Sequence, residues 1–215
     1  MNEILPSIGL YLMNELLPGI FHWRVSHPDI LIEVDSFYVY SLKPAFLIDP
    51  LVPQEGIDWF RERPAPKHIY LTNRLHDRHC RRFIENFFVT VWCHEAGLHE
   101  FADENLDVTA FRFGDELPGG VRALEVGVLC PEETAFLLPT AGGILSIGDA
   151  MINEDGELGF VPDTLIGDDP PAVKRGLKAA LLKICQQETF DHLLFAHGDP
   201  IIGGGKETLR TFCQH

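Results

Sequence analysis

The stretch Leu71-Thr72-Asn73-Arg74-Leu75-His76-Asp77-Arg78-His79-Cys80 decides how the rest of the chain is interpreted. An apolar run at 68–71 leads into it and predicts a strand, and the segment 81–86 that follows predicts a helix. A polar, histidine-rich turn between the carboxyl end of a strand and the start of a helix is where α/β proteins place their chemistry. We therefore expect the functional site at this turn.

Composition bounds the class of protein. The chain has 215 residues, of which 46% are hydrophobic and 23% charged, which is typical of one globular domain spanning 1–215. The net charge is −15, with only 17 lysines and arginines. Nucleic-acid recognition depends on basic side chains that neutralise phosphates, so a nucleic-acid partner is not expected. A small-molecule partner is compatible with this charge.

The five cysteines are odd in number and form no Cys-x-x-Cys pair. This pattern predicts reduced, mostly buried thiols in a cytoplasmic protein. The apolar amino terminus is interrupted by Glu3, Asn14 and Glu15, and no basic region precedes it. We therefore expect neither a signal peptide nor a membrane span. The sequence leaves the oligomeric state undetermined.

The hydrophobic pattern predicts two kinds of organisation along the chain. Short strands separated by turn residues indicate an antiparallel meander, and strands and helices then alternate. A short helix is expected within residues 1–20. Strands are expected at 21–25, 30–34, 37–41, 45–50, 68–71, 87–93, 121–126, 134–138, 143–147 and 190–196, with helices at 57–60, 81–86, 94–101, 170–187 and 203–212. The helix from Pro170 to Gln187 is the clearest, because Asp168 or Asp169 can cap it and proline is tolerated in a first turn.

The order of several landmarks resembles that of the metallo-β-lactamase superfamily over nearly the whole chain. Set against that family's Thr-His-x-His-x-Asp-His loop, Thr72 and Asp77 match. The resemblance implies an α/β (α+β) fold, a four-layer αββα sandwich of two mixed β-sheets, with a site at one edge that usually holds two zinc or iron ions for hydrolysis. The landmarks are the strand end 47–50, the loop 72–78, the turn 114–117, Gly148-Asp149 and His197-Gly198.

The resemblance also implies that the first metal site is lost. The family's three histidines for that ion correspond here to Asn73, Leu75 and Leu129. A leucine offers no lone pair and an amide oxygen is a poor zinc ligand, whereas zinc requires about four N, S or O donors. We therefore expect no ion at the first site.

Part of the second metal site remains. Asp77, Asp149 and His197 match the family's ligands, and Arg78 replaces its histidine. Three donors and a water can hold one divalent ion, for which zinc is the first candidate. A permanent positive charge on Arg78 would oppose a cation beside it.

A metal-free site is the opposite interpretation. Asp77 and Asp149 facing each other without an ion would repel, and the guanidinium of Arg78 or Arg74 could supply the missing positive charge. A third arrangement would use His76 or His79 as a ligand, since the two lie three residues apart and would share a face of a helical turn.

Two functions follow from these alternatives. The first is a non-canonical, metal-free member of the superfamily that uses the former active-site cleft to bind a small molecule or partner. The second is a mononuclear metal-dependent hydrolase of an ester, thioester or amide that uses Asp77, Asp149 and His197. In both cases the cleft is expected to be lined by Asn73, Arg74, His76, Arg78 and His79.

Overall fold

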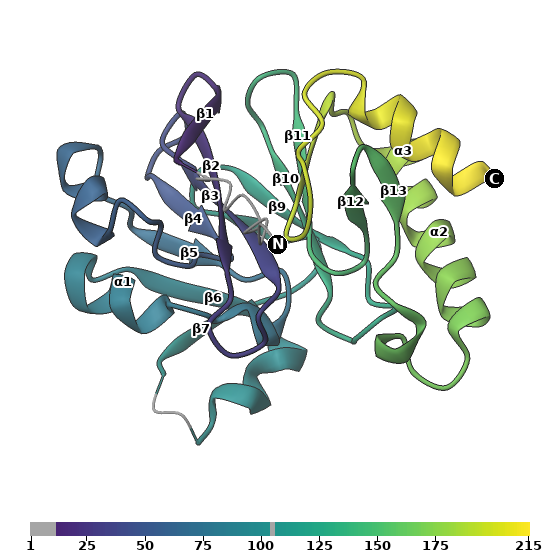
Figure 1. The fold of residues 1–215 in the computed structure, drawn as a ribbon, viewed down its shortest axis with the longest axis horizontal. Helices are drawn as coiled ribbons and strands as arrows, with labels where there is room; N and C mark the ends of the chain where they lie inside the picture. The colour runs from purple at the N-terminus through teal and green to yellow at the C-terminus, as the bar shows by residue number, and fades with distance from the viewer. Residues whose placement is uncertain (1–11, 104–105) are drawn as a thin grey trace, which may run out of the picture.

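A computed structural model describes residues 12–103 and 106–215 (Figure 1). The strands are β1 Asn14–Leu17, β2 Ile20–Ser26, β3 Glu33–Val39, β4 Phe46–Ile48, β5 His68–Tyr70, β6 Thr90–His94, β7 Val108–Phe111, β8 Glu116–Leu117, β9 Val121–Glu125, β10 Thr134–Leu138, β11 Ile144–Ile147, β12 Ile152–Glu154, β13 Glu157–Gly159 and β14 His192–Phe195. The α-helices are α1 Cys80–Phe87, α2 Pro170–Gln187 and α3 Gly205–Gln214. The 3-10 helices are η1 Ile57–Glu62, η2 Arg74–His76, η3 Glu95–Phe101 and η4 Asp163–Leu165.

The first sheet contains β1 to β7 in chain order. Strands β1 to β4 are antiparallel, which confirms the expected meander, and β4 to β7 are parallel. Parallel pairing requires a crossover between strands, and α1 and η3 supply two of these crossovers. The carboxyl ends of the parallel strands therefore meet at one edge, where η2 follows β5.

The second sheet has the order β14-β11-β10-β9-β8. Its strands are antiparallel except for β11 and β14, which run parallel with Ile147 opposite Phe195. The carboxyl ends of these two strands therefore lie side by side. A separate ribbon of β12 and β13 stands next to them.

Secondary structure stacks in four layers, with the two sheets between helices on either side (Figure 1). Three apolar layers hold them together. One lies between α1 with η1 and the first sheet, and includes Phe60 and Phe83. The middle one joins the two sheets and includes Phe46 and Phe136. The third packs Leu177 and other residues of α2 and α3 on the second sheet. These layers confirm the expected αββα arrangement of two mixed sheets.

Helix α2 has the predicted bounds because its cap is encoded locally. The Asp169 side chain accepts a hydrogen bond from the Ala172 amide at 3.0 Å, and Pro170 stands in the first turn.

The largest differences from the predicted elements lie in the first three strands of the first sheet. Residues 14–17 form β1, so the part of the predicted 1–20 helix that the structure describes is not helical, and residues 1–11 lie outside the described range. One strand, β3, replaces the two expected at 30–34 and 37–41, and Leu31 has a left-handed φ of 56° in the turn before it. Apolar residues there mark the rim of a cleft rather than a strand. No helix within the described residues combines the length and apolar character needed to cross a bilayer.

Candidate functional site

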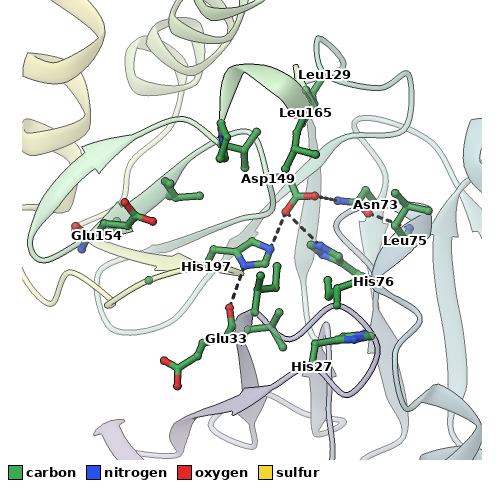
Figure 2. A pocket seen from close by; sticks show the side chains of 18 of the residues that line it. His27, Glu33, Asn73, Leu75, His76, Leu129, Asp149, Glu154, Leu165 and His197 are labelled. Carbon is green, nitrogen blue, oxygen red and sulfur yellow. Dashed lines mark hydrogen bonds and ion pairs between the residues drawn. The ribbon is translucent and has the colours of Figure 1, made fainter. Parts of the chain in front are cut away.

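A cleft of about 910 Å³ opens where the carboxyl ends of β5, β11 and β14 meet. Figure 2 shows its lining side chains. One wall comes from the β2–β3 turn of the first sheet, and the other from residues 152–165 after the second sheet's β11. A cleft of this size matches those that bind small organic molecules.

The turn that follows β5 is organised by its own side chains. Asn73 caps η2, with its Oδ1 accepting a hydrogen bond from the Leu75 amide at 2.9 Å. Three residues complete one turn of a 3-10 helix, and the last of them, His76, is buried beneath the cleft. Leu75 is 60% exposed and lines the opening.

Three side chains converge at the floor of the cleft: His76, Asp149 and His197. Nε2 of His76 lies 3.2 Å from Oδ1 of Asp149, and Nε2 of His197 lies 3.1 Å from the same oxygen. The three potential ligand atoms lie within 4.8 Å of one another, and Figure 2 shows both rings directed at the carboxylate. We call these three residues the His-Asp-His cluster.

The ring of His76 is oriented from behind by Asp49. Its Nδ1 lies 3.0 Å from Asp49 Oδ2 and 2.9 Å from Thr72 Oγ1. The Thr72 amide and hydroxyl both donate to the Asp49 carboxylate, at 2.9 and 2.6 Å, so the hydroxyl hydrogen is already committed. Nδ1 of His76 therefore carries the hydrogen and donates it. A buried carboxylate that holds a histidine in this way is the usual second partner of a metal-binding imidazole.

His197 is oriented by a second set of contacts. Its Nδ1 donates to the Glu33 carbonyl at 3.3 Å, since a carbonyl can only accept. The next residue, Gly198, donates from its amide to Asp35 Oδ2 at 2.7 Å. Gly198 has a φ of +107°, and a Cβ there would come within 1.9 Å of the Asn153 carbonyl oxygen. Glycine is therefore required at this position.

The Asp35 carboxylate is fully buried and ties the two sheets together. Its Oδ1 is 2.9 Å from Arg24 Nε and also contacts His22, while its Oδ2 accepts from the Gly198 amide. The residue lies in β3 of the first sheet and holds the loop after β14 of the second. We call this contact the Asp35 clamp.

The hydrogen positions leave the Asp149 carboxylate in need of a nearby positive charge. With both Nδ1 atoms donating, the neutral imidazoles of His76 and His197 turn their Nε2 lone pairs toward a carboxylate oxygen. Oδ1 of Asp149 is buried and has no hydrogen bond of acceptable geometry among the described residues. Three converging lone pairs require positive charge between them, either protons on the rings or a metal ion.

The pKa values of His76 and Asp149 are shifted in the directions that place positive charge on the ring and negative charge on the carboxylate. Burial lowers the pKa of His76, but the carboxylates of Asp149 and Asp49 outweigh it and raise the value from 6.5 to about 9. Burial raises the pKa of Asp149, but His76 and His197 hold it well below its ordinary value. Without a metal, the ring of His76 is therefore protonated at neutral pH and forms an ion pair with both carboxylates.

Arg74 and Arg78, the two arginines expected to lie between Asp77 and Asp149, contact other groups. Arg78 Nη1 donates to the main-chain oxygens of Asp35 and Asp49, at 2.9 and 2.7 Å. Arg74 pairs with Glu132 and, at 3.2 Å, with Glu100. Without a metal, a protonated His76 would be the cation that lies between the carboxylates of Asp49 and Asp149.

The buried carboxylate of Glu133 also lies beside the cluster. Its Oε1 accepts from the amides of Asp149 and Ala150, at 3.1 and 3.2 Å, and Asn73 Nδ2 approaches its Oε2 at 3.4 Å. Burial, together with the charge of Asp149, raises the pKa of Glu133 from 4.5 to about 8. Because no motif surrounds Glu133, sequence reasoning missed it.

The raised pKa of Glu133 predicts a pH-dependent stability. The folded state retains this proton up to about pH 8 and the unfolded state releases it near 4.5, so stability is lost as the pH rises through this window. The Glu133→Gln variant cannot ionise there. In chelator-treated protein we expect its melting temperature, relative to wild type, to increase between pH 6 and pH 9.

Glu132→Gln is the matched control, because its pKa is shifted in the opposite direction. Burial raises the pKa of Glu132, but its own backbone amide and the Arg74 guanidinium outweigh burial and lower it. Its contribution is therefore lost in acid, and the variant should not relieve the alkaline loss. Parallel wild-type and Glu133→Gln curves from pH 6 to pH 9 would contradict a protonated Glu133.

The structure places the remaining predicted residues as follows. Asn73, Arg74, His76 and Arg78 line the cleft with Asp149 and His197, and so do Leu75 and Leu129. Among the described residues Asp77 and His79 belong to neither the lining nor the cluster. The Asp77 carbonyl accepts from the Cys80 amide as α1 begins, and His79 Nδ1 accepts from the Val52 amide at 2.9 Å.

The thiol in the loop does not line the cleft. Cys80 is buried, and burial raises the pKa of its thiol well above the ordinary value. All five cysteines are free, as expected for reduced thiols.

Comparison with models of protein families and with curated proteins gives no match. Solved structures do match. One is a metallo-β-lactamase from Erythrobacter litoralis with β-mercaptoethanol in its active site, at a TM-score of 0.67 and 14% identity over 96% of this chain and 97% of that one. Another is a metallo-β-lactamase family protein from Thermus thermophilus, at a TM-score of 0.61 and 17% identity over 93% of this chain and 81% of that one. A variant of a flavo di-iron protein from Thermotoga maritima matches at a TM-score of 0.64 and 15% identity, over 94% of this chain and 60% of that one.

These matches define the class of the fold. The chain has the metallo-β-lactamase fold, as its two mixed sheets and the order of its landmarks indicated. At identities of 14–17% for these three structures, the likeness extends to the fold alone.

The cluster fits one metal ion. In a tetrahedral zinc site with bonds of about 2.1 Å, neighbouring ligand atoms lie about 3.4 Å apart. The two Nε2–Oδ1 separations of 3.1 and 3.2 Å are close to that value. The unsatisfied Asp149 Oδ1 and the two Nδ1 partners provide the donor atom and the ring orientations that an ion needs.

Proposed function

We propose that the protein is a mononuclear metal-dependent hydrolase whose ion is held by His76, Asp149 and His197. The convergence of two imidazoles on one buried carboxylate oxygen carries the proposal. Two histidines and a carboxylate with open positions suit zinc and iron(II). When bound, such an ion would supply Lewis-acid chemistry, polarising a carbonyl and acidifying a water.

The substrate class is an ester, thioester or amide. The cleft opens directly above the cluster, so a carbonyl group can reach it. Asp49 keeps His76 in the tautomer whose Nε2 faces the cleft, and Glu133 in its protonated form supplies an acid beside Asp149. The His76 ligand replaces Asp77 of the sequence-based hypothesis.

Elemental analysis of untagged protein, before and after chelator dialysis, tests this function. We expect close to one zinc, iron or manganese per chain, lost on dialysis and restored by adding the ion. Restored protein should melt at a higher temperature than dialysed protein, because an ion that binds only the folded state stabilises it. Dialysed protein that takes up no ion and whose melting temperature ignores added zinc would exclude the proposal.

A metal-free cleft that binds a small molecule is the second candidate. Its support is the ion pair of His76 with Asp49 and Asp149, and the guanidinium of Arg78, whose Nη2 is enclosed without a hydrogen bond among the described residues. Protons on the rings would then satisfy Asp149. This candidate requires the dialysed, metal-free protein to bind its ligand as tightly as protein supplied with zinc.

A further inference from the structure

The rim of the cleft gathers apolar side chains that face solvent. Eight large hydrophobic residues are exposed in the described parts of the chain, and four of them line this cleft. They are Ile30, Ile32, Leu75 and Leu165, with exposed fractions from 46% to 67%. Scattered exposed leucines need no explanation, but a group of them around one cavity marks a binding surface.

The apolar side chains stand on both walls. Ile30 and Ile32 come from the β2–β3 turn, and Leu165 ends η4 on the opposite wall. Figure 2 draws Leu165 and Leu129 above Asp149, and all three line the cleft, so its lining combines apolar surface with the cluster. A ligand group that reaches from the cluster to the rim would be surrounded by hydrocarbon.

The charges of the cleft disfavour an anion. Four exposed acids line it, Glu33, Glu154, Asp155 and Asp199, on a chain with a net charge of −15. The arginines of the lining are engaged: Arg24 with Asp35 and Asp199, Arg74 with Glu132, and Arg78 with two carbonyls. Nη2 of Arg78 has no hydrogen bond among the described residues, but it is buried. An anionic ligand would therefore meet the four acids with no accessible guanidinium to pair with.

We propose that the cleft selects a substrate with an extended apolar acyl group and no negative charge. This substrate class rests on the proposed function, since the scissile carbonyl would sit at the His-Asp-His cluster. The apolar acyl group would lie between Ile32 and Leu165. An uncharged or cationic remainder would face the acids of the rim.

Calorimetric titration of chelator-treated protein with four non-hydrolysable ligands tests the proposal without the metal. The ligands are octyltrimethylammonium, 1-octanol, octyl sulfate and tetramethylammonium, all used below micelle-forming concentrations. We expect the first two to bind, octyl sulfate to bind at least about tenfold more weakly than octyltrimethylammonium, and tetramethylammonium not to bind. Octyl sulfate binding as tightly as octyltrimethylammonium would overturn the proposal.

A pair of leucine variants locates the binding. Leu165→Ser should weaken octyltrimethylammonium binding at least about fivefold, as expected when an apolar contact is lost. Leu12→Ser is the matched control, because Leu12 is 58% exposed and does not line the cleft. Equal weakening in both variants would refute binding in the cleft.

These titrations separate the two proposals. Selective binding of octyl ligands by protein that takes up no metal would preserve the ligand class and refute the hydrolase. Metal uptake in protein that shows no preference for an octyl group would refute the ligand class alone.

Discussion

Asp149→Asn is expected to abolish metal retention and ester hydrolysis, whereas Asp77→Asn should preserve both. Oδ1 of Asp149 is the atom on which both Nε2 atoms converge. The substitution replaces this carboxylate oxygen with an amide oxygen, a poor ligand, and removes the negative charge that offsets the cation. We expect metal affinity to fall by more than about 100-fold, the upper range for losing even an outer-sphere partner. Elemental analysis after gel filtration measures how much metal each variant retains.

The Asp77 variant makes this result specific. Asp77 lies one residue from His76 and is the ligand that the family motif implies, yet it belongs to neither the cluster nor the lining of the cleft among the described residues. A general effect of removing a carboxylate from this loop would reduce metal content in both variants. Loss of metal in Asp77→Asn with retention in Asp149→Asn would refute the His-Asp-His cluster.

Asp49→Ala is expected to destabilise the protein by about 3–5 kcal/mol, the usual cost of removing one partner from a buried charged network. Asp49 is 1% exposed and accepts from the amide and hydroxyl of Thr72 and from His76 Nδ1. The variant leaves these donors buried and unpaired. For a chain of this length we expect the melting temperature to fall by roughly 10 °C.

Asp58→Ala is the control for this loss. Asp58 forms an exposed ion pair with Arg61 on η1, and such pairs contribute at most about 1 kcal/mol. Denaturant unfolding of both variants separates a buried network from a surface charge. A free energy of unfolding for Asp49→Ala within about 1 kcal/mol of wild type would contradict the network. If the Asp49→Ala variant still folds, its metal affinity should also fall about 10–100-fold, because His76 loses its orienting partner.

Much of the fold could be predicted from the sequence because its signals are local. The cap at Asp169 and the proline after it set the start of α2, and alternating residues set β2 and β9. The ribbon of β12 and β13 escaped prediction, since its strands lack the apolar run that marks the equally short β4 and β5.

The site was harder to predict, because the family motif assigns ligands by their order in the loop, whereas the local backbone decides which side chains reach the cleft. Asn73 caps a 3-10 turn here, and that turn brings His76 to the cleft floor while Asp77 ends the turn. The hypothesis that His76 could act as a ligand anticipated its use, but not its partners. Asp49 and Glu133 come from other strand ends, and only the packed sheets bring them to the cluster.

The Asp35 clamp and the His-Asp-His cluster both join the two sheets, and this affects how cooperatively the chain unfolds. The first sheet is built from β1 to β7 and the second from strands that all follow β7, so the chain divides into two successive halves. His76 belongs to the first half, and Asp149 and His197 belong to the second. Neither half alone contains a complete site, so an ion or ligand bound there would favour the joined halves over the separated ones. An ion or ligand bound in the cleft would therefore stabilise the packing of the two halves against each other. This stabilisation would be measurable as slower hydrogen exchange in both sheets at once.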